Sequence, residues 1–171
     1  MSTTLSRFLV SLLTLAACSC IRSAVPPAAQ GAGFDPIAFF KGHTHGEGDL
    51  QTLFGQRVHV SVDSVGTMGE DGLILDQTIR EAKKPPSERR WTIRRVAQDR
   101  YTGTLTDAIG PVTAEVVGPR AHIRYTMRHG LAVEQQLAQQ PDGTTVLNRL
   151  VVHKFGARVA TLSETIKRVA P

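Results

Sequence analysis

Apolar and polar residues alternate with a period of two through most of the chain from His43 onward. Such alternation is typical of β-strands that have one dry face and one wet face. No segment after His43 combines a 3.6-residue apolar period with helix caps, and we expect residues 159–169 to form the closing strand. The residues predicted to share the dry faces are Val58, Val60, Val62, Trp91, Ile93, Tyr101, Leu105, Val112, Ala114, Val116, Ile123, Tyr125, Met127, Val133, Leu137, Val146, Leu150 and Val152.

Turn signals rich in glycine and proline separate these runs, for example at 85–87, 118–119 and 141–143. Their spacing of about ten residues indicates an antiparallel meander. Nine or ten strands in a chain of 171 residues can form a closed barrel or a sandwich. Closure removes exposed strand edges. The prediction is therefore an all-β fold, an antiparallel up-and-down barrel of about 9–10 strands.

A short helix is expected just before the first strand. Asp35 is a good N-cap, Pro36 suits the first helical position, and Gly42 suits the exit. Phe34, Phe39 and Phe40 supply half of the six phenylalanines of the chain. The pattern predicts a short helix that plugs one end of the β core.

The N-terminus has the pattern of a secretory signal. Arg7 precedes an apolar run over residues 8–15, which is too short to span a bilayer. The run ends in Leu15-Ala16-Ala17-Cys18, which resembles the lipobox of bacterial lipoproteins. The predicted organisation is a lipoprotein signal peptide over 1–17, a lipidated tether over 18–33 attached through Cys18, and a barrel over 34–171. The alternative is an ordinary signal peptide with Cys18 incidental.

By resemblance to enterobacterial lipoproteins, Ser19 after the cysteine implies sorting to the outer membrane, with the protein facing the periplasm. The net charge is +5, and removal of 1–17 takes away only Arg7 and leaves +4. Outside the cytoplasm, anionic lipid head groups are a nearer partner for this charge than nucleic acid. A basic solvated surface is the alternative. Cys18 and Cys20 are the only cysteines, which excludes a disulfide scaffold and a cysteine-based metal site in the barrel.

Several side chains are candidates for ligand binding inside such a barrel. Alternation places Arg89 and Arg95 on the same face as Trp91, and arginine at a rim can bind carboxylate or phosphate. Charge that protects a strand edge is the alternative. Gln135 and Asn148 lie on otherwise apolar faces, where a buried amide satisfies either the backbone or the polar head of a ligand. Trp91, Tyr101 and Tyr125 complete the set of candidate ligand-binding residues.

Metal binding and catalysis have weaker sequence support. His43 and His45 would share one side of a strand, with His59 as a third ligand, but polar surface near a turn is the simpler interpretation. The sequence contains no nucleophile elbow, zinc-protease motif, phosphate loop or dinucleotide fingerprint. We therefore assign no catalytic residue, metal or cofactor.

The order of several short motifs resembles a family of proteobacterial lipoproteins recorded only as a domain of unknown function. These motifs are Phe34-Asp35-Pro36, Phe39-Phe40, Gly42, Gly66-Thr67, Leu75-Asp76, Arg90-Trp91, Tyr101-Thr102-Gly103, Asn148-Arg149 and Lys154-Phe155-Gly156-Ala157-Arg158-Val159. The resemblance implies a lipocalin-like barrel, although the Gly-x-Trp of true lipocalins is absent. The family's acidic and aromatic patches are replaced here at 77–80 and 135–141, which places any site built on them in question.

Three functions are compatible with these features. The first is a periplasmic lipoprotein that binds a hydrophobic or lipid ligand, such as a fatty acid or phospholipid, in the barrel. The second is a small enzyme that acts on membrane lipids, which requires ionisable groups converging in the interior. The third is a structural or assembly lipoprotein with a filled interior that binds an unknown protein partner.

Overall fold

The computed structural model describes residues 26–28, 33–55, 57–82 and 84–170. The predicted signal peptide and the predicted lipid attachment at Cys18 lie outside these residues. None of the helices in the described part of the chain is long and apolar enough to cross a membrane.

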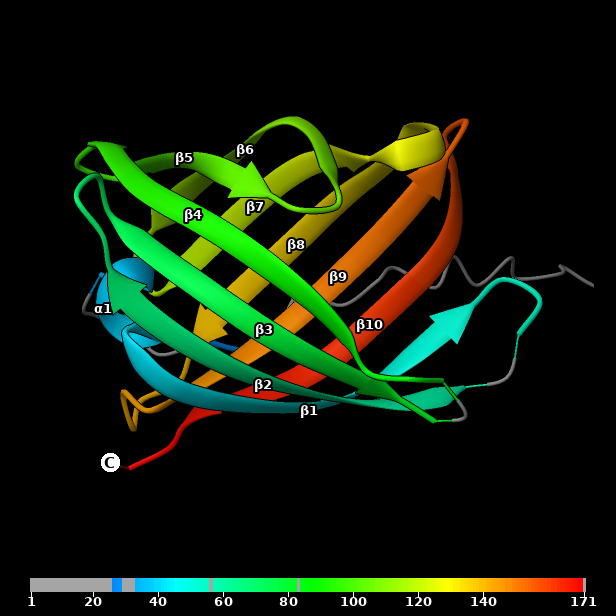
Figure 1. The fold of residues 1–171 in the computed structure, drawn as a ribbon, viewed down its shortest axis with the longest axis horizontal. Coiled ribbons are helices and arrows are strands. Elements are labelled where there is room, and N and C mark those ends of the chain that lie inside the picture. The colour runs from blue at the N-terminus through cyan, green and yellow to red at the C-terminus, as the bar shows by residue number, and fades with distance from the viewer. Residues whose placement is uncertain (1–25, 29–32, 56, 83, 171) are drawn as a thin grey trace, which may run out of the picture.

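Ten antiparallel strands close into a barrel, as Figure 1 shows. Each strand pairs with its neighbours in sequence, and β1 pairs with β10 to close the sheet, so the barrel is up-and-down. The strands are β1 (Gly42–Thr52), β2 (Val58–Met68), β3 (Leu73–Glu81), β4 (Ser87–Ala97), β5 (Arg100–Leu105), β6 (Ala108–Val117), β7 (Arg120–Met127), β8 (Leu131–Gln139), β9 (Thr145–Lys154) and β10 (Ala157–Arg168).

The predicted alternation and closing strand are confirmed. Val60 and Val62 are buried while their neighbour His59 is exposed, and buried residues alternate with less buried ones over parts of the other strands, as at Val146 and Asn148 of β9. Residues 159–168 belong to β10, whose pairing with β1 completes the barrel. The period of two therefore identified both the strands and the faces that they turn inward.

The helix α1 (Pro36–Phe40) plugs one end of the barrel, as predicted. The Asp35 carboxylate accepts hydrogen bonds from the backbone N–H groups of Ile37 and Ala38, at 3.0 and 3.3 Å. Phe39 packs edge-on against Phe40, with ring centroids 5.0 Å apart. Here the term plug denotes residues 34–40.

Two strand residues hold the plug in place. Arg168 Nη1 at the end of β10 donates to the carbonyls of Ala38 and Phe39, at 2.7 and 2.6 Å. Gly66 of β2 lies so close that a Cβ there would come within 1.9 Å of the Phe40 carbonyl oxygen. The end of the plug therefore packs directly against the backbone of β2 at a position where any side chain would clash with it.

The two ends of the barrel differ. The closed end holds the plug, the β2–β3, β4–β5, β6–β7 and β8–β9 connections and the end of β10. The opposite end, called the mouth below, carries the β1–β2, β3–β4, β5–β6, β7–β8 and β9–β10 connections. The described residues Pro26 and Pro27 accept hydrogen bonds from Arg120 and Gln140, so this part of the chain lies at the closed end.

Candidate functional site

The interior of the barrel holds a cavity of about 430 Å³. Its lining runs from Pro36 and Phe40 of the plug to Thr52, Glu81 and Leu131 at the mouth. A volume of this size falls within the range of about 300–1,000 Å³ that small-molecule sites occupy. The third function considered above, a structural or assembly lipoprotein, predicted a filled interior, and the cavity contradicts that prediction.

Small inward-facing residues leave this space open. Ala114, Ala121 and Gly103 line the cavity from three different strands. Gly103 is required by the sheet itself, because a Cβ there would lie 1.7 Å from the Thr92 carbonyl oxygen. Ten strands also enclose a wider interior than the eight-stranded barrels that side chains just fill.

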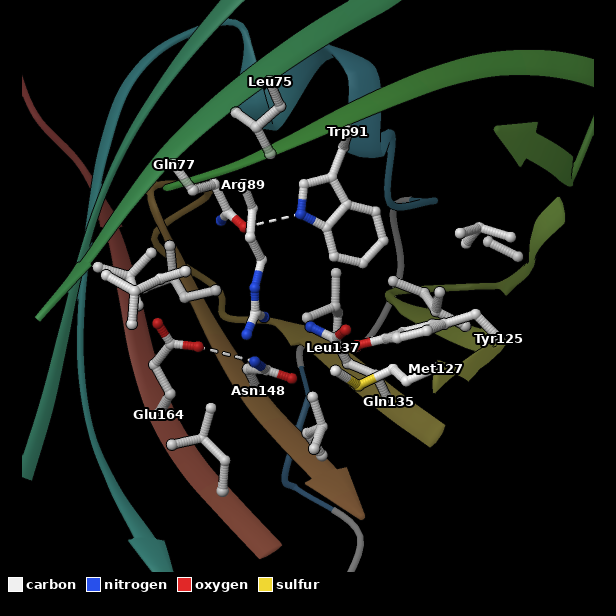
Figure 2. Close-up of a pocket in the computed structure, with 18 of the residues that line it drawn as sticks. Leu75, Gln77, Arg89, Trp91, Tyr125, Met127, Gln135, Leu137, Asn148 and Glu164 are labelled. Atoms are coloured by element: carbon white, nitrogen blue, oxygen red, sulfur yellow. Dashed lines mark hydrogen bonds between the residues drawn. The ribbon is translucent and has the colours of Figure 1, made fainter. Parts of the chain in front are cut away.

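Aromatic side chains form one wall of the cavity (Figure 2). Trp91 packs edge-on against Tyr125, with ring centroids 5.5 Å apart and an interplanar angle of 87°. The Trp91 indole N–H donates to Gln77 Oε1 at 2.7 Å, which satisfies its polar group. Burial raises the pKa of the Tyr125 hydroxyl to about 12, so this group is neutral and available as a hydrogen-bond donor.

A buried polar pair lies on the neighbouring wall. Asn148 of β9 donates from Nδ2 to Glu164 Oε2 of β10 at 2.7 Å. The Glu164 carboxylate occupies the space over Gly46 of β1, where a Cβ would lie 2.0 Å from Oε1. Burial raises the pKa of Glu164 despite the opposing hydrogen bond from Asn148.

Arg89 brings a positive charge into the cavity close to the mouth. Its Nε lies 3.0 Å from Asp107 Oδ2 in the β5–β6 connection, and its side chain remains 30% exposed. Arg89 acts electrostatically on both Tyr125 and Glu164, lowering the pKa of each against the larger effect of burial. Figure 2 shows the guanidinium extending toward the Asn148–Glu164 pair.

Two acceptors in the cavity lining have no hydrogen-bond partner among the described residues. They are Gln135 Oε1 and Asn148 Oδ1. Because Asn148 Nδ2 donates to Glu164, the other end of its amide presents the unpaired oxygen. A buried acceptor left unpaired is unfavourable, so Asn148 Oδ1 favours a ligand or water that donates a hydrogen bond.

The structure places six of the seven predicted barrel residues in the cavity lining: Arg89, Trp91, Tyr101, Tyr125, Gln135 and Asn148. Arg95 lies on the predicted inward side, directly across from the buried Tyr101, but at the rim of the closed end and not in the cavity lining. It donates to Asp35 Oδ2 at 2.8 Å and covers the Tyr101 ring, 4.9 Å from its centroid. The helix cap therefore occupies the arginine that was a candidate for ligand binding.

Sequence reasoning missed Glu164 and Gln77, which also line the cavity. The signal for Glu164 was its place between Leu162 and Ile166 on the alternating inward face of the closing strand. Only the pairing of that strand with β1 reveals Gly46 opposite the carboxylate, and this long-range register is not visible in the sequence.

The histidines considered as metal ligands lie on the outer face of β1 and β2. His45 contacts Asp63 through Nδ1 at 2.6 Å and Glu47 through Nε2 at 2.7 Å. His59 Nε2 lies 2.5 Å from Glu47 Oε2. Among the described residues, no three His, Cys, Asp or Glu side chains are arranged to hold a metal ion. The hydrogen bond between His45 and Asp63, and secondly the one with Glu47, raises the pKa of His45.

The fold and the cavity define a lipocalin-like barrel with a ligand-sized interior. The chain belongs to the family described as protein of unknown function (DUF3833), whose model matches residues 12–168. No curated protein sequence matches the chain.

Two solved structures share the fold at low sequence identity. An S-type phycobiliprotein lyase from Guillardia theta has a TM-score of 0.63 and 7% identity, with 79% of this chain and 91% of that chain covered. A DUF3598-family protein of unknown function from Nostoc punctiforme has a TM-score of 0.57 and 12% identity, over 78% of this chain and 48% of that chain. At these identities the comparison establishes the barrel architecture alone.

Proposed function

We propose that this protein binds an acyl lipid in the barrel cavity and is held on the periplasmic side of the outer membrane through a lipidated Cys18. The observation that carries the proposal is a cavity whose lining is mainly apolar and includes a few polar side chains. Trp91, Leu75 and Phe40 offer apolar surface for a chain, while Arg89 and Asn148 offer hydrogen bonds for a polar head. Each CH₂ that a chain buries contributes about 0.8 kcal/mol.

The hydrogen-bonding groups of Arg89 and Asn148 determine which head groups fit the cavity. Arg89 favours an anionic or acceptor oxygen, and Asn148 Oδ1 requires a hydroxyl or N–H donor. Lipids with both features include hydroxylated fatty acids and lysophospholipids with a glycerol head. A fatty acid or phospholipid, the classes expected from the sequence, satisfies the Arg89 requirement.

Trp91 makes binding directly measurable. It is the only tryptophan in the chain and lies in the cavity wall, so its fluorescence reports occupancy without a label. We expect saturable changes in Trp91 emission on titration with palmitate and with 3-hydroxypalmitate. A flat titration with both lipids, in protein from which co-purified lipid has been removed, would exclude acyl lipid binding.

A matched pair of variants tests the role of Arg89. Arg89→Met removes the inward charge, whereas Arg90→Met removes the neighbouring outward charge, which pairs with Asp76 at 2.6 Å. A hydrogen bond to a charged group contributes about 1.5–3 kcal/mol, so Arg89→Met should weaken palmitate binding about tenfold to a hundredfold. Binding of methyl palmitate should change little. Equal losses in both variants would contradict a head group at Arg89.

The membrane anchor has its own test. The apolar run, the small residues and Cys18 support lipidation, and the match to the family model begins at residue 12, within this segment. Mass spectrometry of the N-terminal peptide from membrane-extracted protein should show Cys18 with a diacylglycerol linked to its sulfur and an acyl chain on its amino group. An unmodified N-terminus would contradict the anchor.

An enzyme acting on lipids is the second candidate, favoured by the approach of two ionisable groups, Glu164 and Arg89, in one cavity. The raised pKa and the burial of Glu164 suit a group that takes up and releases a proton during a reaction. Incubation with an ester lipid, followed by mass spectrometry, would show product from the parent and none from Glu164→Gln. If the parent and Glu164→Gln both bind the lipid and neither forms product, the protein acts as a carrier and not as an enzyme.

A further inference from the structure

The mouth displays two fully exposed phenylalanines that have no role in the barrel. Phe54 in the β1–β2 hairpin is 97% exposed, and Phe155 in the β9–β10 turn is 96% exposed. The backbone N–H of Leu53 donates to the Val159 carbonyl at 2.8 Å, which joins the two hairpins side by side. Figure 1 shows both turns at the end of the barrel opposite α1.

The backbone at Phe155 makes this residue more unusual. Its φ of 51° lies in the left-handed region, and Gly156 follows with a φ of 80°. Asparagine, aspartate or glycine is the usual choice at the first position of such a turn, because other side chains are strained there. With 96% of Phe155 exposed, little packing within the barrel offsets this strain, and the strained position is therefore a candidate functional feature.

Cations share this end of the barrel with the aromatic side chains. Lys154 Nζ lies 5.7 Å from the centre of the Phe155 ring. Arg57, which lies 4.0 Å from Asp49, and Arg128 are exposed in other connections at the mouth, where Lys84 pairs with Glu81 at 2.5 Å. Projecting aromatic rings accompanied by Lys and Arg are typical of surfaces that bind the interface of an anionic bilayer.

We propose that the mouth docks on a bilayer containing anionic lipids, with Phe54 and Phe155 inserted at the interface and the surrounding cations facing lipid phosphates. Two separate projecting tips suit a soft lipid surface, whereas a protein partner requires a continuous contact of about 800 Å² on each side. The cavity opens at the same end, so docking would place its mouth at the source of an acyl ligand. This last consequence rests on the proposed function, but docking itself does not.

The first experiment identifies which end of the full chain meets the membrane. In a Trp91→Phe background, Phe155→Trp places the sole tryptophan at the mouth, and Val117→Trp places it at the closed end. Val117 is the matched control because it is also exposed, at 71%. With vesicles of phosphatidylcholine and phosphatidylglycerol that carry brominated chains, we expect strong quenching at position 155 and little at 117. Equal quenching, or stronger quenching at 117, overturns the proposal, including the case in which the N-terminal segment alone binds the vesicles.

The second experiment keeps Trp91 in place. Phe54→Ser combined with Phe155→Asn should lower the partition of the full chain onto phosphatidylglycerol vesicles by about tenfold or more, since each buried ring contributes substantially. Val117→Ser should leave the partition unchanged. Loss of binding in pure phosphatidylcholine would confirm the charge requirement, and an unchanged partition of the double variant overturns docking. Titration of Trp91 with palmitate in vesicle-free buffer should be unaffected by the double variant, so a failure of docking and a failure of ligand binding are distinguishable.

Discussion

Gly66→Ala tests whether the plug is seated on the barrel wall as described. A Cβ at this position would lie 1.9 Å from the Phe40 carbonyl oxygen and 2.8 Å from its carbon. Both atoms belong to the backbone, so no side-chain rotation relieves the clash. To restore a contact of about 3.2 Å, the end of α1 must withdraw by about 1.3 Å, which disturbs the packing of Phe39 and Phe40.

Two opposing effects set the magnitude. Alanine in a strand is more favourable than glycine by about 0.5–1 kcal/mol, since glycine loses more backbone entropy on folding. Overpacking a close contact costs about 1–3 kcal/mol. The expected net result is a loss of about 1–2 kcal/mol, which lowers the Tm of a domain of this size by about 4–8 °C.

Urea unfolding followed by far-UV circular dichroism and Trp91 fluorescence measures this change. Val65→Ala is the control, because Val65 is the preceding residue and points outward with substantial exposure. It should shift the unfolding midpoint only slightly. A Gly66→Ala protein more stable than the parent would show that the strand propensity prevails and that the plug does not press on β2.

Three further changes test other parts of the structure. Asp35→Ala removes the cap of α1 and the partner of Arg95, and should lower the free energy of unfolding by about 1–2 kcal/mol in urea titrations; no loss would mean that α1 needs no cap. Phe155→Asn should raise the free energy of unfolding by about 0.5–1 kcal/mol, because asparagine tolerates the left-handed backbone, and a drop in Tm would refute the strain. His45→Gln should destabilise the protein below pH 6.5, and this difference should fade as the pH rises through the elevated pKa of His45, because its Asp63 and Glu47 contacts favour the protonated folded form. A difference that grows with pH in parallel unfolding curves would contradict that sign.

The sequence was sufficient for the architecture because the relevant information is local. Asp35, Pro36 and Gly42 define a helix boundary within one turn, and alternation identifies each strand without knowledge of its partner. The closed barrel could be predicted because nine or ten strands in one short chain would otherwise leave strand edges exposed. The same alternation placed Gln135 and Asn148 among inward-facing residues, where the cavity lies.

The polar centre of the cavity depended on information that is not local. Glu164 is accommodated because Gly46, 118 positions earlier, lies beside it when β1 pairs with β10. Arg95 points to its expected side, but its pairing with Asp35 of the plug, 60 positions earlier, keeps it out of the cavity and is not visible in the strand pattern. Alternation describes regular strands, so it gives no warning of bulges or of which small residue faces which polar one.

The positions of the polar groups and of the projecting phenylalanines support one orientation for a bound lipid. Arg89 lies near the start of β4 and pairs with Asp107 in a connection at the mouth, whereas Leu75 and Phe40 line the cavity toward the plug. A chain that entered tail first would reach the apolar floor while its head group followed last, past Arg89 near the mouth. With Phe54 and Phe155 at the bilayer interface, Arg89 would lie close to the level of the lipid head groups. The head would then exchange one polar environment for another while only the tail changed its surroundings, which removes the largest desolvation cost of lifting a lipid from a membrane.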